Sequence, residues 1–256
     1  MSLQRSLRRA LDPSLLFEAV GLEADPWQRQ LLVAPQPQTI LCCSRQAGKS
    51  LVSAALAVDE AIHRPPALVL ILAPALRQSQ ESFRKVKRIL AGLGPDAPPL
   101  ANESALSLET VAGSRIVCLP GKEATVRGYS SVGLLIVDEA AKVVDDLYMS
   151  VRPMLSVSRG RILLLSTPFG RRGFFHHEWE EGGREWERVK ITAYDVPRIE
   201  RVWLEAERNR IGDWWFRQEY LCEFVETEDQ VFHYSDVVRA GRADIQPLFP
   251  LSGVAA

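Results

Sequence analysis

The stretch QTILCCSRQAGKSLVSAAL, residues 38–56, determines which fold we expect for this 256-residue chain. Its first six residues form a short, largely apolar run with β-branched members, which predicts a buried strand. From Gly48 to about His63 the apolar residues recur at helical spacing. A helix that begins directly after a strand and a tight loop presents free N–H groups and the positive end of its dipole at one point. Such a point binds phosphate.

The loop within this stretch, SRQAGKS, ends like a phosphate-binding loop but departs from the usual G-x-x-x-x-G-K-[ST] pattern. Cys43 stands where the pattern has its first glycine, and Arg45 lies inside the loop. Gly48 allows close approach of the backbone, Lys49 would reach the β- and γ-phosphates, and the Ser50 hydroxyl would ligate Mg²⁺. The predicted nucleotide-binding residues are Ser44, Arg45, Gln46, Ala47, Gly48, Lys49 and Ser50. The alternative is that Gly-Lys-Ser merely begins a helix.

Further apolar runs predict the rest of the sheet. Residues 67–74, 132–141 and 160–168 are expected to be buried strands, and residues 104–121 two strands around a turn. Helices are expected at residues 12–21, 25–35, 75–90 and 145–157. This alternation predicts an α/β fold with a doubly wound, mainly parallel sheet. Ligands of such sheets bind at the carboxyl ends of the strands.

Polar residues stand at the ends of two of these strands. Asp138 ends the run LLIVD, where it can hold Mg²⁺ through water, and Glu139 can orient and deprotonate an attacking water. The alternative for this pair is an acidic helix cap. Ser166 and Thr167 end the run LLLST, where small hydroxyl groups can sense the γ-phosphate and transmit a shift. The alternative for them is an ordinary turn.

Two further side chains are candidates for the same site. Gln28 lies in a predicted helix shortly before the first strand, and glutamine can pair with the amino and N7 edge of adenine. Arg127, in the run TVRGYSS, could stabilise transition-state charge in cis or in trans. A solvated helix position for Gln28 and a surface position for Arg127 are the alternatives.

Two aromatic and histidine clusters are interpreted as structural. His176 and His177 are adjacent, so on a helix their rings diverge by about 100°, and we expect a solvated surface rather than a metal site. Trp214, Trp215 and Phe216 could stack on bases, but we expect them to form the core of a small helical subdomain.

The composition is that of a globular intracellular protein. The net charge of −1 argues against non-specific coating of polyanions, although a local basic patch stays possible. The four cysteines show no C-x-x-C spacing, and we expect reduced core residues. No apolar run approaches the roughly 18 residues of a membrane span, and the basic start lacks the apolar core of a signal peptide. We therefore expect neither secretion nor a membrane partner.

Four segments together resemble the ATPase part of the large terminase subunits of tailed bacteriophages. These are SRQAGKS at 44–50, LLIVDEAA at 134–141, LLLSTPFGRRGFF at 163–175 and FRQEYLCEFVETEDQVF at 216–232. The similarity runs from about Asp25 to Phe232. An arginine-bearing loop is characteristic of that family, so the missing first glycine is the family's own variation.

The resemblance implies a P-loop NTPase of the RecA/ASCE-like type that hydrolyses ATP with Mg²⁺. Residues 1–195 would be the ATPase core, 196–228 a helical lid, and 229–256 a tail toward a nuclease domain that we do not expect in this chain. Lys49, Glu139 and Arg127 would be catalytic, with Arg127 as a finger given across subunits. Asp138 and Ser50 would hold the magnesium, Ser166-Thr167-Pro168 would be the coupling motif, and Gln28 would read adenine.

The resemblance also implies partners. Such proteins assemble as rings, generally pentamers, on the portal protein, cooperate with a small terminase subunit, and drive double-stranded DNA into the capsid in the cytoplasm of an infected bacterium. No nuclease activity is expected in this chain.

Two other functions fit the same motifs. A DEAD-box-type helicase shares a Lys-Ser loop and Asp-Glu acids, but it needs a second RecA-like domain, for which 256 residues leave no room. The other is a module that binds ATP for ring assembly without efficient hydrolysis.

Overall fold

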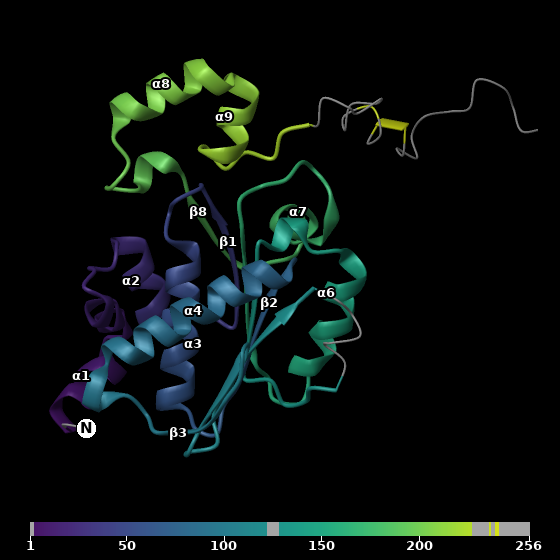
Figure 1. The fold of residues 1–256 in the computed structure, drawn as a ribbon. Helices are drawn as coiled ribbons and strands as arrows, with labels where there is room; N and C mark the ends of the chain where they lie inside the picture. The colour runs from purple at the N-terminus through teal and green to yellow at the C-terminus, as the bar shows by residue number, and fades with distance from the viewer. Residues whose placement is uncertain (1–2, 122–127, 227–235, 237–238, 241–256) are drawn as a thin grey trace, which may run out of the picture.

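A mixed eight-stranded sheet forms the centre of the molecule, with the strand order β3-β4-β5-β2-β6-β7-β1-β8. The computed structural model describes residues 3–121, 128–226, 236, 239 and 240 (Figure 1). The strands are β1 (Gln38–Cys43), β2 (Leu68–Ala73), β3 (Leu100–Glu103), β4 (Ser107–Thr110), β5 (Arg115–Pro120), β6 (Leu134–Asp138), β7 (Arg161–Ser166) and β8 (Glu187–Ile191).

Six neighbouring strands, from β5 to β8 in this order, run parallel, and β4 and β3 add an antiparallel edge. The register aligns the strand ends that matter here: Cys42 pairs with Ser166, and Asp138 pairs with Leu165. The phosphate loop, Asp138 and Ser166 therefore lie at one edge of the sheet.

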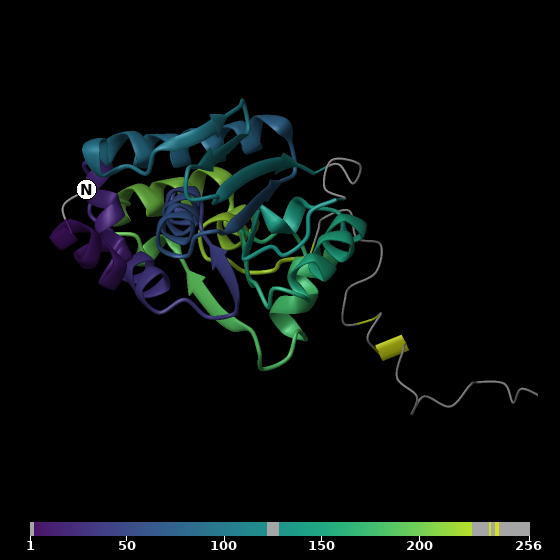
Figure 2. The same ribbon diagram turned by 90° about the horizontal axis from the view of Figure 1, so that it is seen from below.

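Helices cover both faces of the sheet. They are α1 (Leu3–Leu11), η1 (Pro13–Val20), α2 (Pro26–Val33), α3 (Lys49–His63), α4 (Leu76–Gly92), η2 (Gly94–Asp96), η3 (Ala140–Lys142), α6 (Asp145–Val151), η4 (Arg152–Leu155), α7 (Gly173–Glu180), η5 (Ala193–Asp195), α8 (Arg201–Ile211) and α9 (Asp213–Glu219). Helices η1, α2, α3 and α4 bury one core against the sheet, and α6 and α7 bury another. Figure 2 shows the N-terminal helices and the α6–α7 region on opposite sides of the molecule, as in Figure 1.

The alternation of side chains along the central strands explains the two cores. In β2, Val69 and Ile71 belong to the core under α3 and α4, whereas Leu70 and Leu72 belong to the core under α6 and α7. A strand that is covered on both faces is apolar throughout, which is why the uninterrupted apolar runs predicted these strands. The expected doubly wound, mainly parallel sheet is confirmed.

Helices α8 and α9 pack around a small core of their own, formed by Ala193, Leu204 and Phe216. Figure 1 shows them to one side of the sheet, above β1 and β8. The carbonyl of Glu219, at the end of α9, accepts the backbone N–H of Arg45 at 3.1 Å. This bond fixes the end of α9 at the phosphate loop.

Some expectations were incomplete or wrong. Strands β3 and β8 were not expected, because all four residues of β3 are exposed and β8 is a charged edge strand. A single helix over residues 145–157 is also wrong: α6 ends at Val151, and a 3-10 turn follows. Pro153 has no N–H for the α-helical ladder and its ring opposes the preceding turn.

The expected helix at 12–21 is a 3-10 helix, capped by Asp12 and ended by Gly21 in the left-handed conformation. All four cysteines are free and buried, as expected. No helix among the described residues is long and apolar enough to span a membrane.

Candidate nucleotide-binding site

The loop between β1 and α3 is held from two sides. The Ser44 N–H donates to the carbonyl of Ile191 in β8 at 2.8 Å, and the Arg45 N–H donates to the carbonyl of Glu219. Gln46 and Gly48 have φ values of 61° and 91°, so the chain turns through left-handed conformations before α3 begins at Lys49. The free N–H groups of the first turn of α3 therefore lie at the loop, as the sequence predicted.

Lys49 lies inside the loop with only 8% of its surface exposed. Its ammonium donates to Thr167 Oγ1 at 2.9 Å, to the Ser44 carbonyl at 3.2 Å and to the Cys43 carbonyl at 3.5 Å. Carbonyl and hydroxyl oxygens thus hold a buried positive charge without a carboxylate. The bond to Thr167 also brings the ends of β1 and β7 together.

Asp138 is a buried carboxylate at the end of β6, 5% exposed. Its Oδ2 accepts the hydroxyl of Ser82 in α4 at 3.2 Å, and its Oδ1 accepts the N–H of Glu139 at 3.0 Å. Burial, and next the negative charge of Glu139, raise the pKa of Asp138, while Lys49, Lys85 and Ser82 oppose the shift. None of the described lysines and arginines pairs with this carboxylate at ion-pair distance.

Glu139 adopts a left-handed backbone conformation, with a φ of 52°. That conformation is uncommon for a residue with a side chain and is concentrated at functional sites. The Glu139 carboxylate pairs with Lys142 at 3.2 Å and is partly exposed. The turn therefore directs a carboxylate out of the sheet immediately beyond Asp138.

These groups line one cavity of about 670 Å³. Its wall consists of Arg45, Gln46, Ala47, Gly48, Lys49, Ser50, Leu51, Gln78, Lys85, Glu139, Lys142, Thr167, Pro168, Phe169, Trp215 and Glu219. The structure thus brings together most of the loop, Glu139 and Thr167. Asp138, Ser44 and Ser166 are buried behind this wall; the Ser166 hydroxyl donates to the Thr167 carbonyl at 2.8 Å.

Gln28 lies against the loop but does not line the cavity, and it is 2% exposed. Its Oε1 accepts the Asp25 N–H at 2.9 Å, and its Nε2 donates to the Ala47 carbonyl at 3.4 Å. The solvated helix position weighed for Gln28 is therefore wrong. Pairing with adenine would require the amide to exchange these bonds, so the role of adenine reader stays a prediction.

The two arginines that the sequence singled out stand differently. Arg127 lies outside the described residues. Arg45 is described: its Nε bonds to the Glu219 carboxylate in addition to the backbone bond. The hydrogen bond to Glu219 raises the pKa of the Arg45 guanidinium. The loop arginine thus links the phosphate loop to α9 in this structure.

The histidine and aromatic clusters only partly match their expected positions. His176 is buried and packs edge-on against Phe224 at 4.9 Å between ring centres, so the expected solvated position is wrong for it. Burial lowers the pKa of His176. His177 is exposed, as expected. Phe216 is a core residue, but Trp215 is 47% exposed and lines the cavity, so only part of that aromatic cluster is core.

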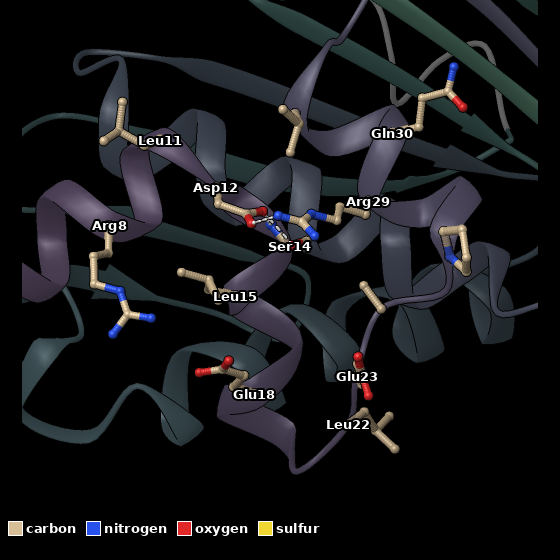
Figure 3. A pocket seen from close by; sticks show the side chains of 13 residues that line it. Arg8, Leu11, Asp12, Ser14, Leu15, Glu18, Leu22, Glu23, Arg29 and Gln30 are labelled. Atoms are coloured by element: carbon tan, nitrogen blue, oxygen red, sulfur yellow. Dashed lines mark hydrogen bonds and ion pairs between the residues drawn. The ribbon is translucent and has the colours of Figure 1, made fainter.

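A larger hollow of about 920 Å³ lies on the N-terminal helices and is lined by a different set of residues from α1, η1 and α2 (Figure 3). Figure 3 shows Arg29 reaching Asp12 beside Ser14, and the Arg29–Asp12 ion pair measures 2.7 Å. None of the predicted site residues lines this hollow.

Several residues of the cavity wall were missed from the sequence. Gln78 and Lys85 come from α4, and Trp215 and Glu219 from α9. Gln78, Ser82 and Lys85 follow a buried strand at spacings of four and three, which places them on one face of a helix. That polar face on an otherwise core-packed helix was the available signal.

The arrangement of strands defines the class of the fold. The loop follows β1, the acids follow β6, and β7 with its Ser-Thr end lies between them. This is a P-loop NTPase fold of the ASCE-like type.

The sequence profile described as "Terminase large subunit, T4likevirus-type, N-terminal" matches residues 40–239, so the chain belongs to this family. A large terminase subunit of Thermus virus P23-45 is 28% identical, covering 91% of this chain and 55% of the relative. One of Escherichia phage T5 is 26% identical, covering 75% of this chain and 44% of the relative. The chain thus spans about half the length of the curated relatives it matches.

Solved structures give the same fold. The large terminase ATPase domain of Thermus phage P74-26 superposes with a TM-score of 0.71 at 27% identity, covering 84% of this chain and all of that chain. The large terminase of another thermophilic bacteriophage, solved in complex with ATP-gamma-S, has a TM-score of 0.64 at 15% identity, covering 78% of this chain and 53% of that chain.

Proposed function

We propose that this chain binds ATP with Mg²⁺ in the cavity at the phosphate loop and hydrolyses it. In the whole protein this hydrolysis would drive double-stranded viral DNA into a capsid. The observation that carries the proposal is the meeting of the loop, Glu139 and Thr167 in one cavity, with Asp138 directly behind. Membership of the terminase family and the likeness to the P74-26 ATPase domain support it.

The loop would hold the triphosphate. Backbone N–H groups from Gln46 to Ser50 surround the start of α3, where anions are favoured. Lys49 would leave the loop carbonyls for phosphate oxygens, because a charged acceptor makes a stronger bond than a carbonyl. Arg45 would reach the phosphates or their surroundings after leaving Glu219.

Ser50 and Asp138 fit a magnesium site. They supply a hydroxyl and a carboxylate, and Mg²⁺ is usually bound through one or two such protein oxygens together with phosphates and waters. The buried Asp138 carboxylate, which has no ion-pair partner among the described lysines and arginines, fits a neighbouring cation bound through water. When bound, Mg²⁺ would neutralise charge on the phosphate oxygens.

Glu139 would act as the general base. Its left-handed turn and its pairing with Lys142 direct the carboxylate into the cavity wall, where it could accept a proton from the attacking water. Thr167, bonded to Lys49, would register whether Lys49 has moved to phosphate, and Ser166 would transmit the change along β7.

The finer assignments follow from the family. Gln28 would read adenine, and residues 196–228 would act as a lid over the cavity. Arg127 of one subunit would complete the site of the next in a ring, generally a pentamer, that works with a portal protein and a small terminase subunit in the host cytoplasm. Mixed rings test the finger: Arg127→Ala subunits should regain hydrolysis when combined with Lys49→Ala subunits. Proven mixed rings that stay inactive would remove the role in trans.

Glu139→Ala separates hydrolysis from binding. Wild type and variant are compared at high protein concentration with double-stranded DNA, ATP and magnesium, by phosphate release and by equilibrium binding of ATP. We expect the variant to bind ATP as wild type does and to release phosphate at least about 100-fold more slowly, the scale of one general base. Equal release by both proteins would refute the role of Glu139, and absent ATP binding by wild type would refute the proposed function.

A further inference from the structure

Four cations line the nucleotide cavity, and one of them differs from the rest. Lys49 bonds to the loop carbonyls and Thr167, Arg45 pairs with Glu219, and Lys142 pairs with Glu139. Lys85 has no hydrogen-bond or ion-pair partner among the described residues. A half-buried ammonium that lines a cavity without an acceptor is well placed for an anionic ligand.

Helix α4 directs Lys85 into this cavity. Gln78, Ser82 and Lys85 lie on one face of the helix, since residues three and four apart are neighbours there. The middle member donates its hydroxyl to Asp138 Oδ2 at 3.2 Å, and Gln78 and Lys85 both line the cavity. This face of α4 is therefore anchored at the carboxyl end of β6, next to the acids of the site.

The other charged residues of α4 point to a specific placement of Lys85. Arg84 pairs with Glu81 within the helix, and Lys87 pairs with Glu103 of β3 at 2.7 Å on the surface. Lys85 lies between them in sequence but faces the cavity. Its charge also acts on Asp138, where it opposes the rise in the pKa of that carboxyl.

We propose that Lys85 is a second triphosphate-binding lysine of the site, contributed by α4 in addition to the lysine of the phosphate loop. The inference rests on the proposed function and adds a contact to phosphate oxygens from α4, a helix outside the loop. Lys85 would act as a point charge with rotatable donors, the way lysine binds phosphate elsewhere. The contact is to the polyphosphate and not to the base.

The test uses calorimetric titration with magnesium and two ligands, ATP and inorganic tripolyphosphate. Lys85→Met removes the charge and keeps the length of the side chain. Lys87→Met is the matched control on the same helix, and Lys85→Arg restores a positive charge. We expect Lys85→Met to weaken both ligands by the same factor, on the order of 10- to 100-fold, which is the scale of one hydrogen bond to a charged group.

The remaining expectations make the inference refutable. Lys87→Met should bind both ligands as wild type does, and Lys85→Arg should recover most of the lost affinity. Thermal melting of each variant checks that it is folded, and the Lys85→Arg variant tests the charge even where the methionine variant melts early. If Lys85→Met binds like Lys87→Met, or loses ATP but not tripolyphosphate, the inference is wrong. Failure of wild type to bind either ligand would instead overturn the proposed function.

Discussion

Thr167→Val tests the bond that joins the phosphate loop to β7. The valine keeps the shape of threonine but removes Oγ1, which accepts the Lys49 ammonium at 2.9 Å. Both side chains are buried, and the remaining acceptors, the Ser44 and Cys43 carbonyls, are farther away, at 3.2 and 3.5 Å. A hydrogen bond to a charged group contributes about 1.5–3 kcal/mol, so the free energy of unfolding should fall by about that amount.

The loss is measured by thermal and urea denaturation without nucleotide. In a domain of this size each kcal/mol lowers the melting temperature by roughly 2–4 °C, so the variant should melt roughly 3–12 °C below wild type. Thr167→Ser keeps an oxygen acceptor and is the matched control, with a smaller expected loss. In saturating ATP with magnesium the difference should shrink, because the ammonium gains phosphate oxygens in place of Thr167.

Two outcomes would refute this reasoning. If Thr167→Val melts with wild type in the absence of nucleotide, the bond between Lys49 and Thr167 does not stabilise the free protein. If the deficit is the same with and without ATP, Lys49 does not exchange Thr167 for phosphate, and the proposed function of the lysine fails at that step.

Two further predictions concern the loop and the cysteines. Gly48→Ala places a Cβ 2.5 Å from Gln28 Nε2 at a φ of 91°, whereas in Gly21→Ala, at a φ of 70°, the added Cβ meets nothing within 4 Å. Both variants carry the left-handed cost of about 1–2 kcal/mol; urea unfolding should show a larger loss for Gly48→Ala, and equal losses would contradict the contact with Gln28. All four cysteines are buried, and burial raises the pKa of Cys118 to about 12 and that of Cys42 and Cys43 well above the usual value, so these thiols stay protonated at pH 8. Ellman's reagent at pH 8 should therefore detect four thiols per chain only in denaturant, and rapid reaction of the folded protein would contradict this burial.

The central strands could be predicted from the sequence because burial on both faces makes them continuously apolar. β2, with the run LVLILA, is the clearest case. β8, with the run ERVKI, could not be predicted in this way, because an edge strand carries charges that solvent accepts. Its place beside β1 is set by the sheet, and there Ile191 supplies the carbonyl that holds Ser44.

The site divides along the same line. Lys49, Asp138 and Glu139 were predicted because each lies at or just beyond the end of a strand, so local sequence and position in the sheet coincide. Lys85 and Glu219 reach the same cavity from helices that only the tertiary fold brings there. Gln28 shows the converse: its distance from the loop in sequence left its environment open, and packing places it at the Ala47 carbonyl.

The double attachment of Arg45 to Glu219, through the backbone and through the side chain, has a mechanical consequence. Any force that draws α9 away from the sheet must break these bonds and so change how tightly the loop grips its ligand. By thermodynamic reciprocity, filling the loop must then favour or resist that same displacement with equal free energy. Tension applied to the helical cap and ligand concentration are therefore interchangeable variables for this molecule.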